Sequence, residues 1–186
     1  MDHPSSALLD ELPEDTLRGN VAQVLDTLQK NTYRDQPPAR LVAVTKTVGP
    51  AIINRLGALG LQDIGENRTQ VALPKLTKID PHFHLHWIGR LQTNKVKDII
   101  DQVWLFHSLD RVDLAEELER RADQRGLTLP VLVQVNIAGE AQKAGFSPEE
   151  VRPFLRRVGE YPNLRVRGLM AIMPLTDDTA QLTAYF

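Results

Sequence analysis

Short apolar runs alternate with helical patterns along most of the chain. The first run, Leu41 to Val44, is continuous, as in strands that are buried on both faces. Each later run is again followed by apolar residues at helical spacing. The predicted strands span residues 41–44, 61–64, 83–88, 103–106, 130–135 and 164–172, and the predicted helices span residues 13–30, 50–59, 67–78, 92–100, 110–125 and 147–160.

This alternation predicts an α/β fold of parallel βαβ units joined by right-handed crossovers. The pattern alone leaves two architectures open, a doubly wound sheet and a barrel. No Gly-x-Gly-x-x-Gly follows the first strand, which weakens a dinucleotide-binding interpretation. A chain of 186 residues is expected to form one domain.

Composition places the chain among ordinary soluble proteins, with 42% apolar and 25% charged residues. A net charge of -2, with Lys and Arg dispersed, favours no nucleic-acid partner. The absence of cysteine excludes disulfides and thiolate metal ligands and fits a reducing compartment. Without a signal-peptide pattern or an apolar run of about 18 residues, we expect a cytoplasmic protein that does not enter membranes.

Polar side chains of functional type gather at one end of the predicted strands. In parallel α/β folds, ligands lie beyond the carboxyl ends of the strands. For any single position, entry into a loop explains a polar residue equally well. The convergence of five such strand ends favours a site. The candidates are Lys46, Asn67, His86, Ser108 and Asn136, together with Met170 at the end of the sixth strand.

Lys46 is the sharpest of these candidates because it follows the first apolar run almost directly. A lysine this close to an apolar interior loses hydration, so that its amine is easier to deprotonate. A neutral amine is the nucleophile that Schiff-base formation requires. The alternative is that Lys46 points into the loop as a solvated charge.

Three histidines, His82, His84 and His86, stand at alternate positions before and within the third predicted strand. On a strand they share one face and form a candidate zinc site. If the strand begins later, the first histidines lie in a loop and the zinc interpretation fails.

Several motifs in fixed order resemble the pyridoxal-phosphate homeostasis proteins, also called the alanine racemase N-terminal-domain-like or proline-synthase co-transcribed family. The resemblance runs from about Leu17 to the last residue. The residues that carry it are Leu41-Val42-Ala43-Val44-Thr45-Lys46-Thr47, Gly65-Glu66-Asn67-Arg68, His86-Trp87-Ile88-Gly89-Arg90-Leu91-Gln92-Thr93-Asn94-Lys95, Ser108-Leu109-Asp110, Gln134-Val135-Asn136, Gly139-Glu140, Lys143-Ala144-Gly145-Phe146 and Gly168-Leu169-Met170.

The resemblance implies a TIM-type (βα) barrel of the alanine racemase type that binds pyridoxal 5'-phosphate. It implies that Lys46 holds this cofactor as a Schiff base, with Asn67 near the ring. Family members resemble carriers that serve cofactor homeostasis in amino-acid metabolism, without robust catalysis. We therefore expect cofactor-binding residues but no catalytic residue and no metal, and we expect a monomer or weak dimer whose partners include amino acids or enzymes that use the cofactor.

Two other functions remain open at this stage. One is weak racemase or transaminase activity on amino acids, in which His86 or Lys46 moves a proton at the α-carbon. The other follows from departures from the family pattern. Val71, Ala138 and Gln142 replace residues common in the family, and Phe186 precedes its last two strands. We therefore expect a single barrel domain over residues 1–186 with about six βα units, truncated before the final phosphate-binding loops. The second open hypothesis is that a chain without these loops binds nothing stably.

Overall fold

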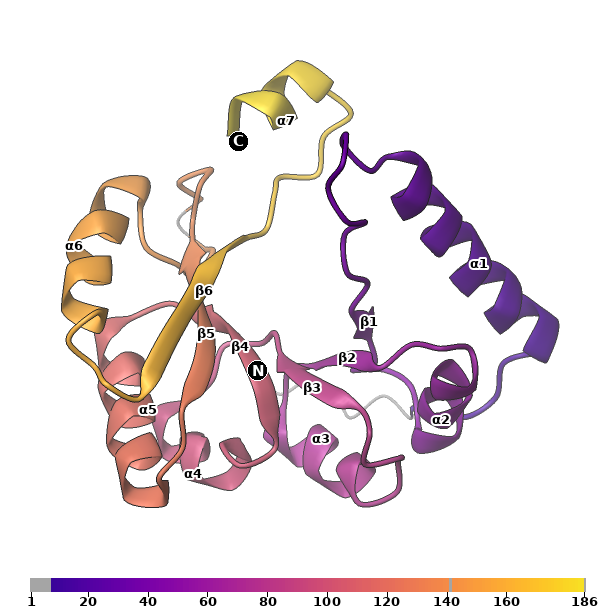
Figure 1. Ribbon diagram of the computed structural model, residues 1–186, viewed down its shortest axis with the longest axis horizontal. Coiled ribbons are helices and arrows are strands. Elements are labelled where there is room, and N and C mark those ends of the chain that lie inside the picture. The colour runs from indigo at the N-terminus through magenta and orange to yellow at the C-terminus, as the bar shows by residue number, and fades with distance from the viewer. Residues whose placement is uncertain (1–7, 141, 186) are drawn as a thin grey trace. The chain divides into compact units, whose positions relative to one another are not determined.

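The structure is a computed structural model that describes residues 8–140 and 142–185 (Figure 1). The chain divides into two compact units, residues 1–86 and 87–186. In chain order the elements are α1 (Glu14–Lys30), β1 (Ala43–Val44), α2 (Pro50–Ala58), β2 (Asp63–Glu66), α3 (Thr69–Leu76), β3 (His84–Trp87), the 3-10 helix η1 (Thr93–Lys95), α4 (Val96–Ile99), β4 (Val103–Leu109), α5 (Val112–Arg125), β5 (Leu129–Val135), α6 (Pro148–Val158), β6 (Leu164–Ala171) and α7 (Thr179–Tyr185).

All six predicted strands are present, but two of them extend past their apolar runs. β2 continues through Glu66, and β4 continues to Leu109, so that Ser108 lies inside the strand rather than after it. Backbone pairing between strands does not require apolar side chains, so polar residues can remain in the ladder. The segment predicted as one helix over residues 92–100 is instead a 3-10 turn followed by the short α4.

In the first unit, the strands follow one another in chain order, β1, β2 and β3. β1 and β2 are parallel, with Ala43 opposite Ile64 and Val44 opposite Gly65. A cluster of buried apolar side chains from α1, α2 and the segment between α2 and β2 fills the space beside these strands. Its members are Leu17, Val21, Ile52, Leu56 and Leu61. The carboxyl ends of β1 and β2 are therefore held at the same edge.

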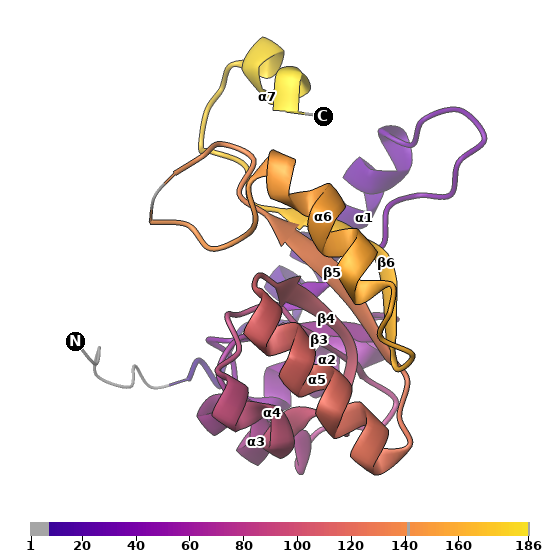
Figure 2. The ribbon, with the colours of Figure 1, turned by 90° about the vertical axis from the view of Figure 1, so that its left-hand side faces the viewer.

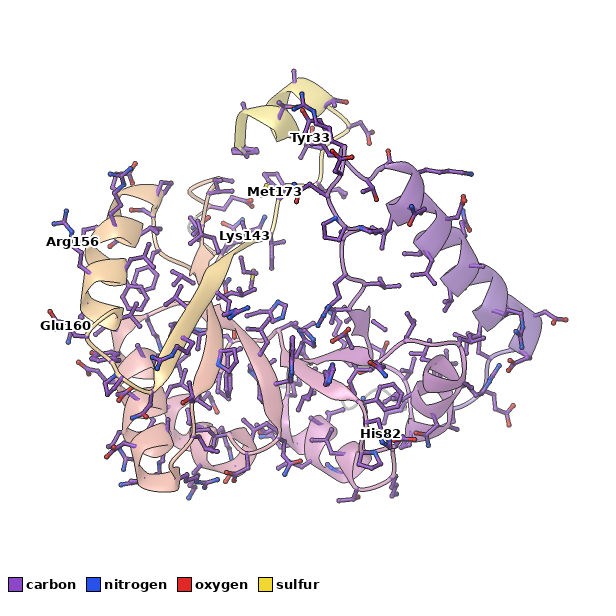
Figure 3. The ribbon with its side chains drawn as sticks, viewed as in Figure 1. Tyr33, His82, Lys143, Arg156, Glu160 and Met173 are labelled. Atoms are coloured by element: carbon purple, nitrogen blue, oxygen red, sulfur yellow. The ribbon has the colours of Figure 1, made fainter. Side chains whose placement is uncertain are left out.

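In the second unit, β4, β5 and β6 form a parallel sheet in chain order. Figures 1 and 2 show α5 and α6 on the same side of these strands. Helix α5 buries Leu114, Leu118 and Ala122, whose spacing places them on one face of the helix. The exposed Arg156 lies on the opposite side of α6, away from the strands (Figure 3).

The start of α6 has the cap that its sequence predicts. Pro148 is the first helical residue, and the Ser147 backbone N–H donates to Glu150 Oε2 at 2.8 Å. This is one half of a capping box, in which a serine and a glutamate satisfy each other's backbone donors. The ring of Phe146, the residue before this cap, stacks on the ring of Phe154 within α6, with the centroids 4.2 Å apart.

The chain after β5 folds back onto the end of that strand. The Asn136 N–H donates to the Phe146 carbonyl, and the Phe146 N–H donates to the Gln134 carbonyl, both at 2.9 Å. Gly145 adopts a φ of 123°, and a Cβ there would lie 2.7 Å from the Asn136 nitrogen. Only glycine fits this conformation without a shift of backbone.

Replacing Gly145 with alanine is expected to destabilise the protein by about 3 kcal/mol or more, because the backbone must move as well as adopt a strained φ. Gly139→Ala is the matched control. Gly139 also has a positive φ, 65°, but among the described residues no atom beyond its chain neighbours lies within 4 Å of the added Cβ. It should lose only about 1–2 kcal/mol. Urea unfolding measures both values, and equal losses would contradict the close approach at Gly145.

Candidate functional site

The first unit brings three predicted site residues to the carboxyl ends of its strands. Lys46 follows β1, Asn67 follows β2 directly, and His86 lies within β3. Asn67 is half-buried, whereas His86 is buried. Because β1 and β2 are parallel and in register, Lys46 and Asn67 leave the sheet at the same edge.

Lys46 lies at the tip of a tight turn. The Val48 N–H donates to the Thr45 carbonyl at 3.1 Å, which makes Lys46 and Thr47 the central residues of a β-turn. The Lys46 side chain is exposed. The loss of hydration that the apolar run suggested is therefore wrong for this structure, since the strand stops at Val44 and the turn carries Lys46 into solvent.

A buried ion pair lies against this turn. Lys75 Nζ is 2.8 Å from Glu66 Oε1 and donates to the Thr45 carbonyl, also at 2.8 Å. The side chains of Lys75 and Glu66 are 3% and 1% exposed. The Thr45 hydroxyl donates to the same Glu66 oxygen at 2.8 Å. The residue before Lys46 is thus fixed through both its carbonyl and its side chain.

Neither the ion pair nor its role at the turn was predicted from the sequence. A signal was present in α3, whose buried residues are Thr69, Ala72 and Lys75. They recur every third residue, so the lysine occupies a position on the inward face. A lysine at such a position is almost never fully buried unless it is paired.

His86 and His84 share one carboxylate oxygen. His86 Nε2 is 2.9 Å and His84 Nδ1 3.2 Å from Asp63 Oδ1, and Arg40 lies 3.5 Å from the same atom. Burial lowers the pKa of His86 below its ordinary value, although the hydrogen bond that the ring donates to the Asp63 carboxylate raises it. Asp63 was not among the predicted residues, because it belongs to β2 and meets the histidines only through strand pairing.

The predicted row of three histidines does not form. β3 begins at His84, which leaves His82 outside the strand with an 86% exposed side chain bonded to Asp80. Over residues 8–140 and 142–185 there is no group of three or more His, Cys, Asp or Glu side chains able to hold a metal ion.

In the second unit, polar bonds join the segments that follow β3 and β4. The Ser108 hydroxyl donates to the Gly89 carbonyl at 2.5 Å. The buried Asp110 carboxylate is paired with Arg90 at 3.2 Å and with Arg111 at 2.6 Å. Ser108 therefore holds a neighbouring loop in place. Arg90, with a 68% exposed side chain, is the cation that reaches furthest into solvent in this group.

Asn136 organises the loop after β5. Its side-chain nitrogen donates to the Glu140 and Lys143 carbonyls at 2.8 and 3.3 Å, and its oxygen accepts from the Glu140 N–H at 3.2 Å. The side chain of Lys143, labelled in Figure 3, is paired with Glu140.

The last predicted residue, Met170, is half-buried within β6. A role for Asn136 and Met170 in cofactor binding stays a prediction.

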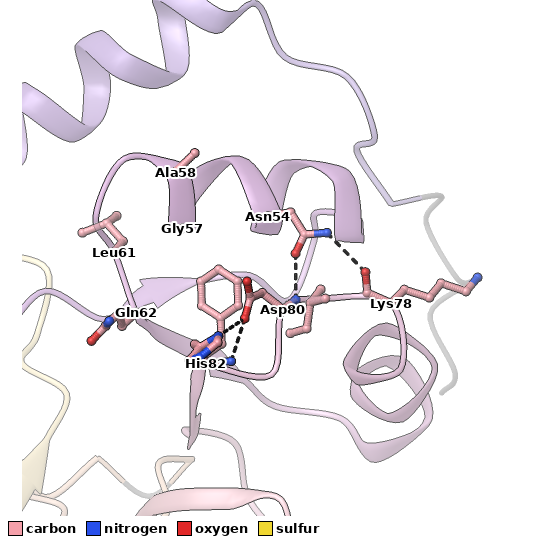
Figure 4. A pocket seen from close by; sticks show the side chains of 10 residues that line it. Asn54, Gly57, Ala58, Leu61, Gln62, Lys78, Asp80 and His82 are labelled. Carbon is pink, nitrogen blue, oxygen red and sulfur yellow. Dashed lines mark hydrogen bonds and ion pairs between the residues drawn. The ribbon is translucent and has the colours of Figure 1, made fainter.

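A hollow of about 610 Å³ lies in the first unit, but not at this edge. It is lined by residues of α2 and by the segment that leads into β3, including Asp80, His82 and Phe83 (Figure 4). Gln62 and Phe83 directly precede β2 and β3, so the hollow opens at the amino ends of these strands. None of the predicted site residues lines it.

The chain matches the family model "Alanine racemase, N-terminal domain" over residues 15–186. It is 39% identical over 170 residues to the pyridoxal phosphate homeostasis protein of Aquifex aeolicus, which covers 89% of this chain and 75% of that protein. The structure resembles that of PipY from Synechococcus elongatus without PLP, with a TM-score of 0.79, 30% identity, and coverage of 90% of this chain and 76% of PipY.

PipY with PLP bound is similar at a TM-score of 0.75 and the same identity and coverage. An alanine racemase from Clostridium difficile shares the fold, with a TM-score of 0.70 at 14% identity over 98% of this chain and 46% of the racemase. The fold therefore belongs to the class of racemase-type βα barrels, as predicted. The chain belongs to the pyridoxal phosphate homeostasis protein family within that class.

Among the residues that the structure describes, no helix has both the length and the apolar character needed to span a membrane.

The lowered pKa of His86 predicts that acid destabilises the fold. An unfolded chain binds a proton at His86 near the ordinary histidine pKa of about 6.5, whereas the folded chain binds it only at lower pH. Between these pKa values the unfolded state holds more protons, so the free energy of unfolding rises with pH by up to about 1.4 kcal/mol per pH unit. Urea unfolding from about pH 5 to about pH 8 measures this slope.

His86→Gln should flatten the slope below pH 6.5, because it removes the titrating group and keeps a hydrogen-bonding side chain toward Asp63. His82→Gln, a change at an exposed histidine, controls for the loss of any imidazole. A His86→Gln profile as steep as that of the wild type would show that His86 does not cause the slope.

Proposed function

We propose that this protein binds pyridoxal phosphate through a Schiff base on Lys46 and serves cofactor homeostasis without robust catalysis. The observation that carries the proposal is the place of Lys46: an exposed amine on a fixed turn at the carboxyl end of a parallel strand. This is the end at which barrels of this class bind their ligands. When bound, the cofactor supplies an aldehyde that condenses with an amine.

The polar groups around Lys46 fit such a ligand. Asn67 offers an amide at the edge where Lys46 leaves the sheet, and an amide both donates to and accepts from polar ring substituents. Lys75, the lysine that lies against the Lys46 turn, is committed to Glu66 and the Thr45 carbonyl. Lys46 is therefore the lysine available to an aldehyde at this edge.

Family membership supports the same conclusion. Relatives named pyridoxal phosphate homeostasis proteins match most of the chain, and PipY, at 30% identity, has been solved with PLP bound. Ser108 and Asn136 stand at the corresponding ends of β4 and β5, where they fix loops through bonds to backbone carbonyls. We propose that their contribution to the cofactor is to shape these loops.

The geometry at His86 argues against a racemase or transaminase in which His86 moves the proton, and the exchange experiment below tests the same role for Lys46. Moving a proton at a substrate α-carbon requires an acid or base that reaches the substrate. His86 is buried at 1% exposure, and its Nε2 is held by Asp63. The proposed chemistry of the chain is therefore to capture, hold and release an aldehyde.

Substitution of Lys46 tests the covalent step. Wild-type protein titrated with pyridoxal phosphate should develop the Schiff-base absorbance near the visible edge, and borohydride should trap the adduct on Lys46. Lys46→Ala and Lys46→Arg should lose both signals, because neither side chain supplies a nucleophilic amine. Peptide mapping by mass spectrometry locates the adduct.

Lys78→Ala is the matched control, since Lys78 is an exposed lysine whose segment lines the hollow at the other end of the strands. It should keep the absorbance and the adduct at Lys46. Wild-type absorbance in Lys46→Ala, or an adduct mapped to a different residue, would show that Lys46 is not the capturing amine.

Exchange of the α-proton tests the absence of catalysis. Cofactor-loaded protein incubated with one enantiomer of an amino acid in deuterated water should leave the α-position protonated. Proton NMR follows the α-signal, and chiral chromatography follows racemisation. Catalytic exchange that disappears in His86→Gln would instead support the enzyme function, with His86 as the group that moves the proton.

A further inference from the structure

Besides the two bonds that its N–H and its hydroxyl donate to the Gly65 carbonyl, at 3.0 and 3.3 Å, three bonds hold the residue that precedes Lys46. The Thr45 carbonyl accepts from the Val48 N–H at 3.1 Å and from Lys75 Nζ at 2.8 Å. The Thr45 hydroxyl donates to Glu66 Oε1 at 2.8 Å. The first of these bonds closes the β-turn, and the other two attach that turn to β2 and α3.

The far side of the turn is held by the chain that precedes α1. The Leu9 N–H donates to the Thr47 carbonyl, and the Gly49 N–H donates to the Leu9 carbonyl, both at 2.9 Å. The backbone on each side of Lys46 is thus bonded to a different segment, while its own side chain remains exposed. This arrangement fixes where the side chain begins and leaves its amine accessible.

A buried ion pair is an expensive means of adding stability. Taking two charges out of water costs several kcal/mol per ion, and apolar residues of similar volume often replace such a pair without loss. Lys75 and Glu66 are nevertheless almost fully buried, and Glu66 Oε2 lacks a hydrogen-bond partner among the described residues. What the pair does supply is a charged donor aimed at one backbone carbonyl.

We propose that Lys75 and Glu66 are positioning residues for Lys46: their ion pair holds the Thr45 carbonyl and so places the Lys46 amine for attack on an aldehyde. This inference rests on the proposed function of Lys46. Capture joins the Lys46 nitrogen to the aldehyde carbon and releases the carbonyl oxygen as water. A displacement of the amine by about 1 Å can slow such a reaction by about 100-fold.

The pair also keeps the second lysine from competing for the aldehyde. The Lys75 ammonium is bonded to a carboxylate and a carbonyl and is 3% exposed. A buried amine that is held by these two bonds cannot approach the carbonyl carbon of a ligand. Of these two lysines, only Lys46 is therefore expected to carry the adduct.

A comparison of single and double variants separates positioning from stability. Lys75→Met leaves the Glu66 carboxylate buried without its partner and should lower the melting temperature by about 10 °C. Lys75→Met combined with Glu66→Met removes both charges and should return the melting temperature to within a few degrees of the wild type. The double variant still lacks the bond to the Thr45 carbonyl.

Two binding measurements then report on the turn. Pyridoxine phosphate has the ring and phosphate of the cofactor but no aldehyde, so calorimetry with it measures binding without the covalent step. The double variant should bind it within about twofold of the wild type, yet capture pyridoxal phosphate about tenfold or more slowly in stopped-flow absorbance. Lys78→Met, the same change at an exposed lysine, should match the wild type in both measurements.

Wild-type capture rates in a stable double variant would overturn the positioning role and leave the proposed function intact. Trapping on a residue other than Lys46 in the wild type would overturn both. If the double variant does not fold, Lys75→Arg replaces it, because the larger guanidinium keeps the charge but shifts the Thr45 carbonyl. Slower capture with unchanged pyridoxine phosphate binding then supports the proposal, and unchanged capture contradicts it.

Discussion

One buried cation connects the first strand, the second strand and the helix that follows it. Lys75 extends from α3 to the carbonyl of Thr45 and to the carboxylate of Glu66, the last residue of β2. Parallel pairing alone aligns the strands, but it does not determine the path of the chain beyond them. The ammonium does so at the point where β1 ends, because it bonds the backbone itself. The position of Lys46 depends on this contact, even though Lys46 makes no part of it.

The same principle recurs at the other strand ends. Ser108 bonds the Gly89 carbonyl, Asp110 joins Arg90 to Arg111, and Asn136 bonds the carbonyls of its own loop. In each case a polar side chain at the end of a strand is used by backbone or by a neighbouring charge. Residue type at a strand end therefore does not by itself distinguish a side chain that can contact a ligand from one that is already bonded within the protein.

The number of the strands could be predicted from the sequence because short apolar runs recur between helical patterns. The expectation that the first run is buried on both faces is wrong, since β1 spans only Ala43 and Val44, and Val44 is 52% exposed. The hydrogen bonds and ion pairs of the site could not be predicted in this way. Asp63 meets His84 and His86 only because β2 and β3 are adjacent, and no spacing within either segment shows it. The exposure of Lys46 could not be predicted from the sequence either, because the apolar run continues toward it while the strand ends at Val44. Of these residues, only Lys75 gave a signal in the sequence, because it is a charged residue on the inward face of a helix.

The loop after β5 illustrates how such a structure accommodates sequence change. Asn136 holds the loop through the carbonyls of Glu140 and Lys143, and Gly145 closes it against the strand. Carbonyl groups are identical in every residue, so these bonds place little constraint on side chains such as those of Ala138 and Gln142, whereas Gly139 is constrained by its positive φ of 65°. Ala138 and Gln142 both fall in this interval. Their side chains can therefore be replaced while the path of the loop is kept by the Asn136 amide and by the glycines at 139 and 145.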